Sequence, residues 1–169
     1  MHILMLTPYL PYPLVSGGQI RTFNLLKNLS QKHKITLFSL IKEADHNYLE
    51  NLAPYCQNIQ VFKRSALPFT PKNILRTGFS SYPFVVMRNL VPETATAVKE
   101  ELTREKYDVI HAETFYMMPN IPETKIPTIL VEQTIEYLGY QSYADTTKRW
   151  YVKPFLDIDI GKITSKLEN

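Results

Sequence analysis

The sequence contains very little cysteine and glycine. Its one cysteine, Cys56, has no partner for an internal disulfide, and no Cys/His cluster has the spacing of a zinc site. We therefore expect no bound metal and a reducing, cytoplasmic setting. Only 5 of the 169 residues are glycine, which makes the adjacent pair Gly17 and Gly18 conspicuous.

Long hydrophobic runs and a strong charge of one sign are also missing. No stretch reaches the roughly 18 apolar residues of a membrane-spanning helix, so any membrane contact would be peripheral. The apolar start is interrupted by Pro8, Pro11 and Pro13 and lacks the basic residues and cleavage site of a secretory signal. Nineteen Lys and Arg against sixteen Asp and Glu leave a net charge of +3, too small to indicate a nucleic-acid partner.

Five short apolar runs have the length of β-strands. Residues 2–6 and 35–41 are nearly continuous runs, which indicates strands that are buried on both faces. Three shorter candidates follow at residues 59–62, 108–112 and 128–131. Burial on both faces is typical of a parallel sheet.

Helical patterns separate these strands. The apolar residues between Thr22 and Leu29 share one helical face, and further helices are predicted at residues 44–53 and 92–106. Strands that alternate with helices predict right-handed βαβ crossovers. The fold class we expect is α/β, with an open, doubly wound, mainly parallel Rossmann-like sheet in the order 3-2-1-4-5 and helices on both faces.

The loop after the first strand ends in Ser16, Gly17, Gly18 and Gln19. Ser16 with Gln19 three residues later is typical of a capping box, which places both glycines in the first turn of a helix. Backbone amides at a helix N-terminus favour phosphate, and the missing Cβ atoms let it approach closely. The pair also suits a tight turn against the sheet, and the loop alone does not separate the two interpretations.

Two common nucleotide-binding motifs are missing from this loop. It contains neither the G-x-G-x-x-G fingerprint of dinucleotide-binding domains nor the G-x-x-x-x-G-K-[ST] phosphate loop. We therefore set aside both a dehydrogenase and a P-loop nucleotide hydrolase.

Polar residues follow the fourth and fifth predicted strands. His111 and Glu113 end one apolar run, and Gln133 and Glu136 follow the next. Ligands of open α/β sheets bind beyond the carboxyl ends of the strands, so these side chains would face the same cleft as the two glycines. Each of them also suits a solvated or loop-bonded strand end.

Three segments, HILMLTPYLPYPLVSGGQIRTFNLLKNLS, YDVIHAE and ILVEQTIEYL, carry a resemblance to a known family. In order and spacing they resemble the N-terminal domain of group 1 (family four) glycosyltransferases, over roughly residues 1–143. Those enzymes have the GT-B architecture of two Rossmann-like domains. The resemblance implies that residues 1–169 form the N-terminal, acceptor-side domain and that the C-terminal, donor-binding domain is absent from this chain.

The resemblance also implies an activity and, together with the polar strand and helix ends, suggests a set of site residues. The activity is transfer of a sugar, with retention of configuration, from a nucleotide-sugar donor to a glycan or lipid-linked hydroxyl, without a separate cofactor. In the family the glycine loop approaches the donor diphosphate or an acceptor group, so Gly17 and Gly18 would bind phosphate. Our own hypothesis, from its position at the end of a strand, is that Glu113 is catalytic and orients or deprotonates the acceptor hydroxyl. The substrate-binding candidates are Arg21, His111, Gln133 and Glu136.

Two positions depart from the family pattern. Many members have a histidine in a His-Asn-x-Glu pattern after the fifth strand, where this chain has Gln133 and keeps only Glu136. Many also have a histidine after the fourth strand, where this chain has Glu113. The donor site, with its Glu-x₇-Glu motif, belongs to the C-terminal domain, so we expect this chain alone to be inactive and to bind sugar nucleotides weakly.

The C-terminal segment, residues 146–169, is predicted to be a helix. Ile160, Ile163 and Leu167 recur at helical spacing and form an apolar stripe that needs a covering surface. We expect this helix to pack on a partner or on a second copy of the chain, or to be mobile.

An alternative function comes from a different class of protein. No complete catalytic constellation lies within the 169 residues, so a noncatalytic α/β binding or interaction module also fits the sequence. In that interpretation the glycine pair is only a turn.

Overall fold

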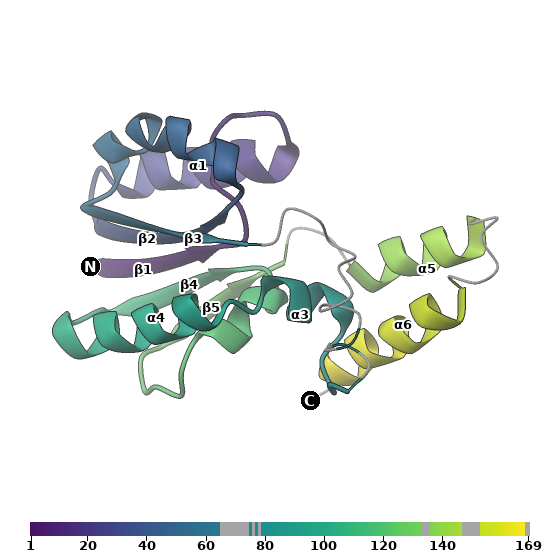
Figure 1. Cartoon of the computed structure of the whole chain (residues 1–169). Helices are drawn as coiled ribbons and strands as arrows, with labels where there is room; N and C mark the ends of the chain where they lie inside the picture. The colour runs from purple at the N-terminus through teal and green to yellow at the C-terminus, as the bar shows by residue number, and fades with distance from the viewer. Residues whose placement is uncertain (65–74, 76, 78, 133–135, 147–152, 168–169) are drawn as a thin grey trace. The chain divides into compact units, whose positions relative to one another are not determined.

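Two compact units make up the chain. The computed structural model describes residues 1–64, 75, 77, 79–132, 136–146 and 153–167 (Figure 1). Unit 1 comprises Met1–Ala66 and Arg88–Gln133, and unit 2 comprises Leu67–Met87 and Thr134–Asn169. From the sequence we expected one domain over residues 1–169, and each unit is described below on its own.

Unit 1 is built on a five-stranded sheet whose order is β3-β2-β1-β4-β5. Every neighbouring pair is parallel. The predicted α/β fold class, with its open parallel sheet and strand order, is therefore confirmed. The strands are β1 (His2–Thr7), β2 (Lys34–Ile41), β3 (Asn58–Lys63), β4 (Val109–Glu113) and β5 (Thr128–Val131).

Helices connect the strands and cover both faces of the sheet (Figure 1). On one side lie α1 (Gly17–Leu29) and the 3₁₀ helix η1 (Glu43–Asn51), which is followed by η2 (Ala53–Tyr55). On the other lie α4 (Pro92–Arg104) and the 3₁₀ helix η3 (Phe115–Asn120). This is the doubly wound arrangement that the sequence predicts.

The predicted helix at residues 44–53 is 3₁₀ rather than α-helical, and it spans Glu43–Asn51. Asp45, His46 and Asn47 are weak helix formers, because short polar side chains compete for the backbone hydrogen bonds. Pro54 then disfavours the α conformation at the residue before it.

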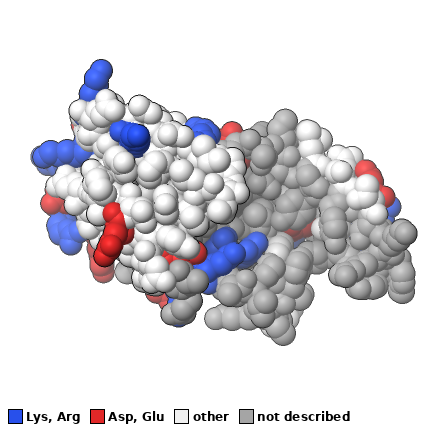
Figure 2. Space-filling model, turned by 90° about the horizontal axis from the view of Figure 1, so that it is seen from above, with Lys and Arg blue, Asp and Glu red and all other residues white. Residues whose placement is uncertain are grey.

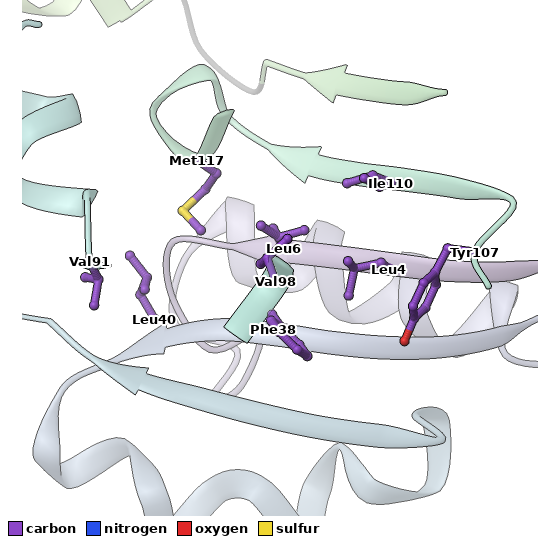
Figure 3. Packing of buried hydrophobic residues seen from close by; sticks show 9 residues of the cluster. All are labelled: Leu4, Leu6, Phe38, Leu40, Val91, Val98, Tyr107, Ile110 and Met117. Carbon is purple, nitrogen blue, oxygen red and sulfur yellow. The ribbon is translucent and has the colours of Figure 1, made fainter. Parts of the chain in front are cut away.

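Successive residues of the central strands point to opposite faces, and both faces are apolar. Leu4 and Leu6 of β1 meet Phe38 and Leu40 of β2 on the α4 side, as Figure 3 shows. Val98 of α4 closes this first cluster. Its other members are Val91, Tyr107, Ile110 and Met117.

The opposite face carries a second cluster beneath α1. Met5 of β1 and Leu37 of β2 are completely buried there, together with Leu26 of α1 and Leu52, which follows η1. Burial on both faces explains why the strands appear in the sequence as nearly continuous apolar runs.

Unit 2 contains two long helices, α5 (Glu136–Thr146) and α6 (Lys153–Leu167), and most of α3 (Phe84–Asn89). The Asp159 carboxylate of α6 accepts a hydrogen bond from the Phe84 amide at 2.5 Å, and Lys162 Nζ donates to the Thr77 carbonyl at 2.8 Å. Of the stripe expected to be uncovered, Ile163 is completely buried and Ile160 is half-buried, while Ile158, which lies outside the stripe, is 62% exposed. Self-association through residues 146–169 stays a prediction.

No helix within the described residues is both long and apolar enough to cross a membrane. On the surface seen in Figure 2, basic and acidic side chains lie among each other rather than in a patch of one sign.

The first core cluster gives a test of the fold. We expect Phe38→Ala to lower the free energy of unfolding by about 3 to 5 kcal/mol, because it removes a completely buried ring and leaves a cavity between β2 and α4. Urea denaturation measures the change. The control is Val15→Ala, at a side chain that is 79% exposed, which should change stability by less than about 0.5 kcal/mol. Equal losses for the two variants would contradict the packing described here.

Cys56 gives a second test. Its side chain packs against the second cluster, and burial raises the pKa of the thiol to about 12. Because the thiolate is the reactive form, the folded protein should react slowly with a thiol reagent at pH 8, and urea should restore the rate of a free cysteine. A rate that is the same with and without urea would show that the thiol is not held in its neutral form.

Candidate functional site

The candidate site lies at the carboxyl edge of the sheet in unit 1. β1 pairs directly with β4, so the loop that leaves β1 and the end of β4 lie at neighbouring places on this edge. The start of α1 and the residues His111 and Glu113 are thereby brought together. Parallel strands put all their carboxyl ends on one side, which is where open α/β sheets bind ligands.

Ser16 caps α1 as the sequence predicts. Its hydroxyl oxygen accepts a hydrogen bond from the Gln19 amide at 3.3 Å, and its carbonyl accepts the bond from the Ile20 amide at 3.0 Å. The reciprocal half of the capping box takes another form, because the Gln19 side chain accepts from the Ser16 hydroxyl and donates to the Leu10 carbonyl. The amides of Gly17 and Gly18 therefore lie in the first turn, ahead of the bonded amides.

The two glycines are not needed for backbone conformation. No described glycine has a positive φ, so neither Gly17 nor Gly18 adopts the left-handed region that favours glycine. A Cβ atom at Gly17 would meet no heavy atom within 4 Å beyond its chain neighbours and the backbone of its own helix. The tight-turn interpretation therefore gains no support at Gly17, and the space above it is open to a ligand.

Three predicted site residues form one hydrogen-bonded group. Arg21 Nη1 donates to both carboxylate oxygens of Glu113, at 2.8 and 3.0 Å, and His111 Nε2 lies 2.9 Å from Glu113 Oε1. The Glu113 side chain is 1% exposed and the His111 side chain 10%, whereas Arg21 is 43% exposed. The arrangement is a buried carboxylate between a buried imidazole and a cation that reaches solvent.

This geometry holds the Glu113 carboxylate in place and leaves some N–H donors of Arg21 available to a ligand. A buried charge is tolerated only when it is paired and hydrogen-bonded, and Arg21 and His111 meet that need. Arg21 uses a single nitrogen, Nη1, for both bonds to Glu113. Within the described part of the chain no hydrogen bond from its Nη2 or Nε is found, so these donors can serve a ligand.

Thr114 is a site residue that the sequence does not reveal. It follows Glu113 with φ 74° and ψ 146°, a backbone conformation that β-branched residues rarely adopt. Its side chain is buried, and its hydroxyl has no partner among the described residues. Strained residues of this kind cost about 1 to 3 kcal/mol and cluster at binding and catalytic sites.

The other two candidates are not joined to this group by the described residues. Gln133 lies outside the part of the chain that the structure describes, and so does the side chain of Glu136, although this residue begins α5 in unit 2. At the end of β5 it is instead the neighbouring Glu132 that makes a contact, accepting a hydrogen bond from the Phe115 amide. This bond ties the segment after β4 to the end of β5.

The described residues contain no cluster of metal-ligating side chains. No group of three or more His, Cys, Asp or Glu side chains has a suitable geometry among them. What the site offers is hydrogen-bond donors, one fixed carboxylate and one imidazole, a set suited to proton transfer and to binding negative charge.

Comparison with known proteins bears on the fold. No protein-family model and no curated protein sequence matches the chain. Among solved structures it is similar to the C-terminal domain of the PF1911 hydrogenase from Pyrococcus furiosus, with a TM-score of 0.53 and 13% identity. The match covers 77% of this chain and 90% of that one. At this identity the likeness shows an α/β fold and says nothing about activity.

The ion pair at the site gives a stability test. We expect Arg21→Gln to lower the free energy of unfolding by about 1 to 3 kcal/mol, because the buried Glu113 carboxylate loses the two bonds from Nη1. Lys27→Gln, on an exposed position of the same helix, is the matched control and should change stability by less than about 0.5 kcal/mol. If thermal or urea denaturation gave the two variants the same stability, the buried pairing would be wrong.

Proposed function

We propose that this chain is the acceptor-side half of a sugar-nucleotide-dependent glycosyltransferase, which transfers a sugar to a glycan or lipid-linked hydroxyl. The observation that carries the proposal is the hydrogen-bonded group of Arg21, His111 and Glu113 at the carboxyl edge, beside the open start of α1. The resemblance of three sequence segments to group 1 glycosyltransferases supports it independently.

Each residue has a role that follows from its surroundings. The amides of Gly17 and Gly18 and the positive end of α1 would stabilise the charge of a phosphate. Glu113 would orient or deprotonate the acceptor hydroxyl, and His111 and Arg21 would hold its carboxylate in place. The unused donors of Arg21 would contact the substrate, and the expected roles of Gln133 and Glu136 in positioning it stay part of the proposal.

The reaction itself would depend on electrostatics. The hydrogen bonds described for Glu113 are to a guanidinium and an imidazole, and no pair of carboxylates is assigned as nucleophile and acid, so we favour departure of the diphosphate from the same face that the acceptor attacks. Amides at the start of α1 are already oriented and need no rearrangement as charge develops on the leaving phosphate. The donor sugar and base would be held by the C-terminal domain that the resemblance implies.

One observation favours the alternative of a noncatalytic binding or interaction module. Glu113 is neutralised by Arg21 and shielded from water, which is also how a purely structural ion pair looks. In that case the carboxylate would fix the end of β4 against α1 and take no part in chemistry. The two functions therefore predict different effects of removing the Glu113 charge. Sugar transfer should be lost if the carboxylate is catalytic and should be kept if the carboxylate is only structural.

The test is Glu113→Gln in the protein that contains both this chain and the donor-binding domain. We expect kcat for sugar transfer to fall by about 10² to 10⁴, because the amide cannot accept the proton of the acceptor hydroxyl. The matched control is Glu100→Gln, on an exposed position of α4, which should leave kcat unchanged. A panel of sugar nucleotides and acceptors supplies the assay.

The result is interpreted together with stability. A loss of kcat with a small change in melting temperature supports the proposed catalytic role. Full turnover of Glu113→Gln would show that Glu113 is structural, and the absence of transfer with every donor and acceptor would favour the binding module.

A further inference from the structure

A second hollow lies beside the start of α1, on the side away from Glu113 in sheet order. It is a pocket of about 410 Å³ between the β1–α1 loop and the residues that follow β2 and β3. Lys42 follows β2 and Arg64 follows β3, so the pocket opens at the same carboxyl edge of the sheet as the candidate site. Ser16 and Gln19 of the α1 cap line it too. We refer to it as the Arg64 pocket.

Apolar and aromatic residues form one half of the lining of the Arg64 pocket, and polar or charged residues form the other half. Tyr9, Pro13 and Tyr48 line it, and the Tyr48 ring lies 5.7 Å from that of Tyr12. Apolar walls combined with oriented polar groups are typical of small-molecule sites. Such walls suit a sugar ring, whose carbon-bound hydrogens form apolar faces.

Arg64 is poorly paired for a cation in such a place. Its Nη1 donates to Asn89 Oδ1 at 3.3 Å, which fixes the guanidinium. Its Nε is buried and has no hydrogen-bond partner among the described residues. Burial, and next to it the neighbouring positive charge of Arg88, lower the pKa of Arg64 from its ordinary value, while Tyr116 and Asp45 act in the opposite direction. The surroundings therefore leave a positive charge that lacks a full counterion.

The charges around the pocket do not balance. Lys42 and Arg64 contribute two positive charges and Asp45 one negative charge. The Asp45 carboxylate also accepts a hydrogen bond from the Lys42 amide at 2.8 Å, so part of its capacity is used by the backbone. With Arg88 close to Arg64, the excess at this place is positive. An anion that enters the pocket would offset it.

We propose that the Arg64 pocket binds a negatively charged group of the sugar acceptor, a carboxylate or a phosphate, through Arg64 and Lys42. This assignment of the acceptor as an acidic sugar rests on the proposed function. It places the charged group beside the aromatic walls and the acceptor hydroxyl towards Glu113, on the other side of the α1 cap. The anion site itself is a property of unit 1 and can be tested without any donor.

The test is an NMR titration of the chain with four probes: glucuronate, its neutral counterpart glucose, inorganic phosphate and glycerol 3-phosphate. We expect saturable binding of glucuronate, of the phosphates or of both, with shifts at Lys42, Arg64 and Tyr48, and no binding of glucose. Arg64→Gln should raise the dissociation constant at least about tenfold, as expected for loss of a charge-assisted hydrogen bond. Lys42→Gln should raise it about threefold, since an exposed cation contributes less.

Two further variants keep the result interpretable. Arg64→Lys keeps the charge but loses the planar fork, so it should bind more weakly than the native chain and more tightly than Arg64→Gln. Lys27→Gln removes a positive charge from an exposed position far along α1 and should bind like the native chain. If Arg64→Gln fails to fold, Lys42→Gln and Arg64→Lys still carry the test.

The outcomes separate this inference from the proposed function. Binding of glucuronate alone would identify a carboxylate and binding of the phosphates alone a phosphate, and either supports the site. No binding by any charged probe, equal binding of glucose, or an equal loss in Lys27→Gln would overturn it. Specific anion binding together with a complete enzyme that transfers no sugar would reject the glycosyltransferase and leave the anion site in place.

Discussion

The parallel pairing of β1 with β2 on one side and β4 on the other is the constraint on which the structure depends. Leu4 lies opposite Thr36 in one partner and Ile110 in the other. Parallel neighbours cannot be joined by a hairpin, so each connection must cross a face of the sheet, and α1 and α4 do so on opposite faces. All carboxyl ends then share one edge. Arg21 meets Glu113 there, although the two are 92 positions apart in sequence.

The same constraint explains why the strands could be predicted so closely. A strand buried on both faces must be apolar along its whole length, so its apolar run and its hydrogen-bonded extent nearly coincide. The run at residues 128–131 matches β5, Thr128–Val131, and each of the others differs by one residue at one or both ends. The type of helix at residues 44–53 could not be predicted in this way, because its apolar spacing suits an α-helix and a 3₁₀ helix equally. The polar side chains that favour the 3₁₀ helix act through local hydrogen bonds to the backbone.

The individual residues of the candidate site could be predicted from the sequence, but the contacts between them could not. His111 and Glu113 were predicted as site residues from their residue type and their position at a strand end. Gly17 was predicted from its place at the start of a helix. Nothing local shows that Arg21 would reach Glu113, because this contact depends on the side-chain direction at the first turn of α1 and on the β1–β4 pairing. The backbone of Thr114 has no sequence signature at all, since a β-branched residue with φ 74° runs against its own preference.

The carboxyl edge of the sheet contains several residues whose arrangement is unfavourable for stability. Packing of the two apolar clusters does not explain them. Glu113 gives up its hydration to lie between Arg21 and His111, and such a pair often contributes no more stability than apolar residues of similar size. Thr114 holds an unfavourable backbone one residue later, and the Nε atom of the half-buried Arg64 has no hydrogen-bond partner among the described residues. Sequences that break local rules tend to do so where function requires it. All three features lie on one edge of the sheet, where ligands of this fold bind, so the proposed acceptor and anion sites would account for them where packing of the core does not.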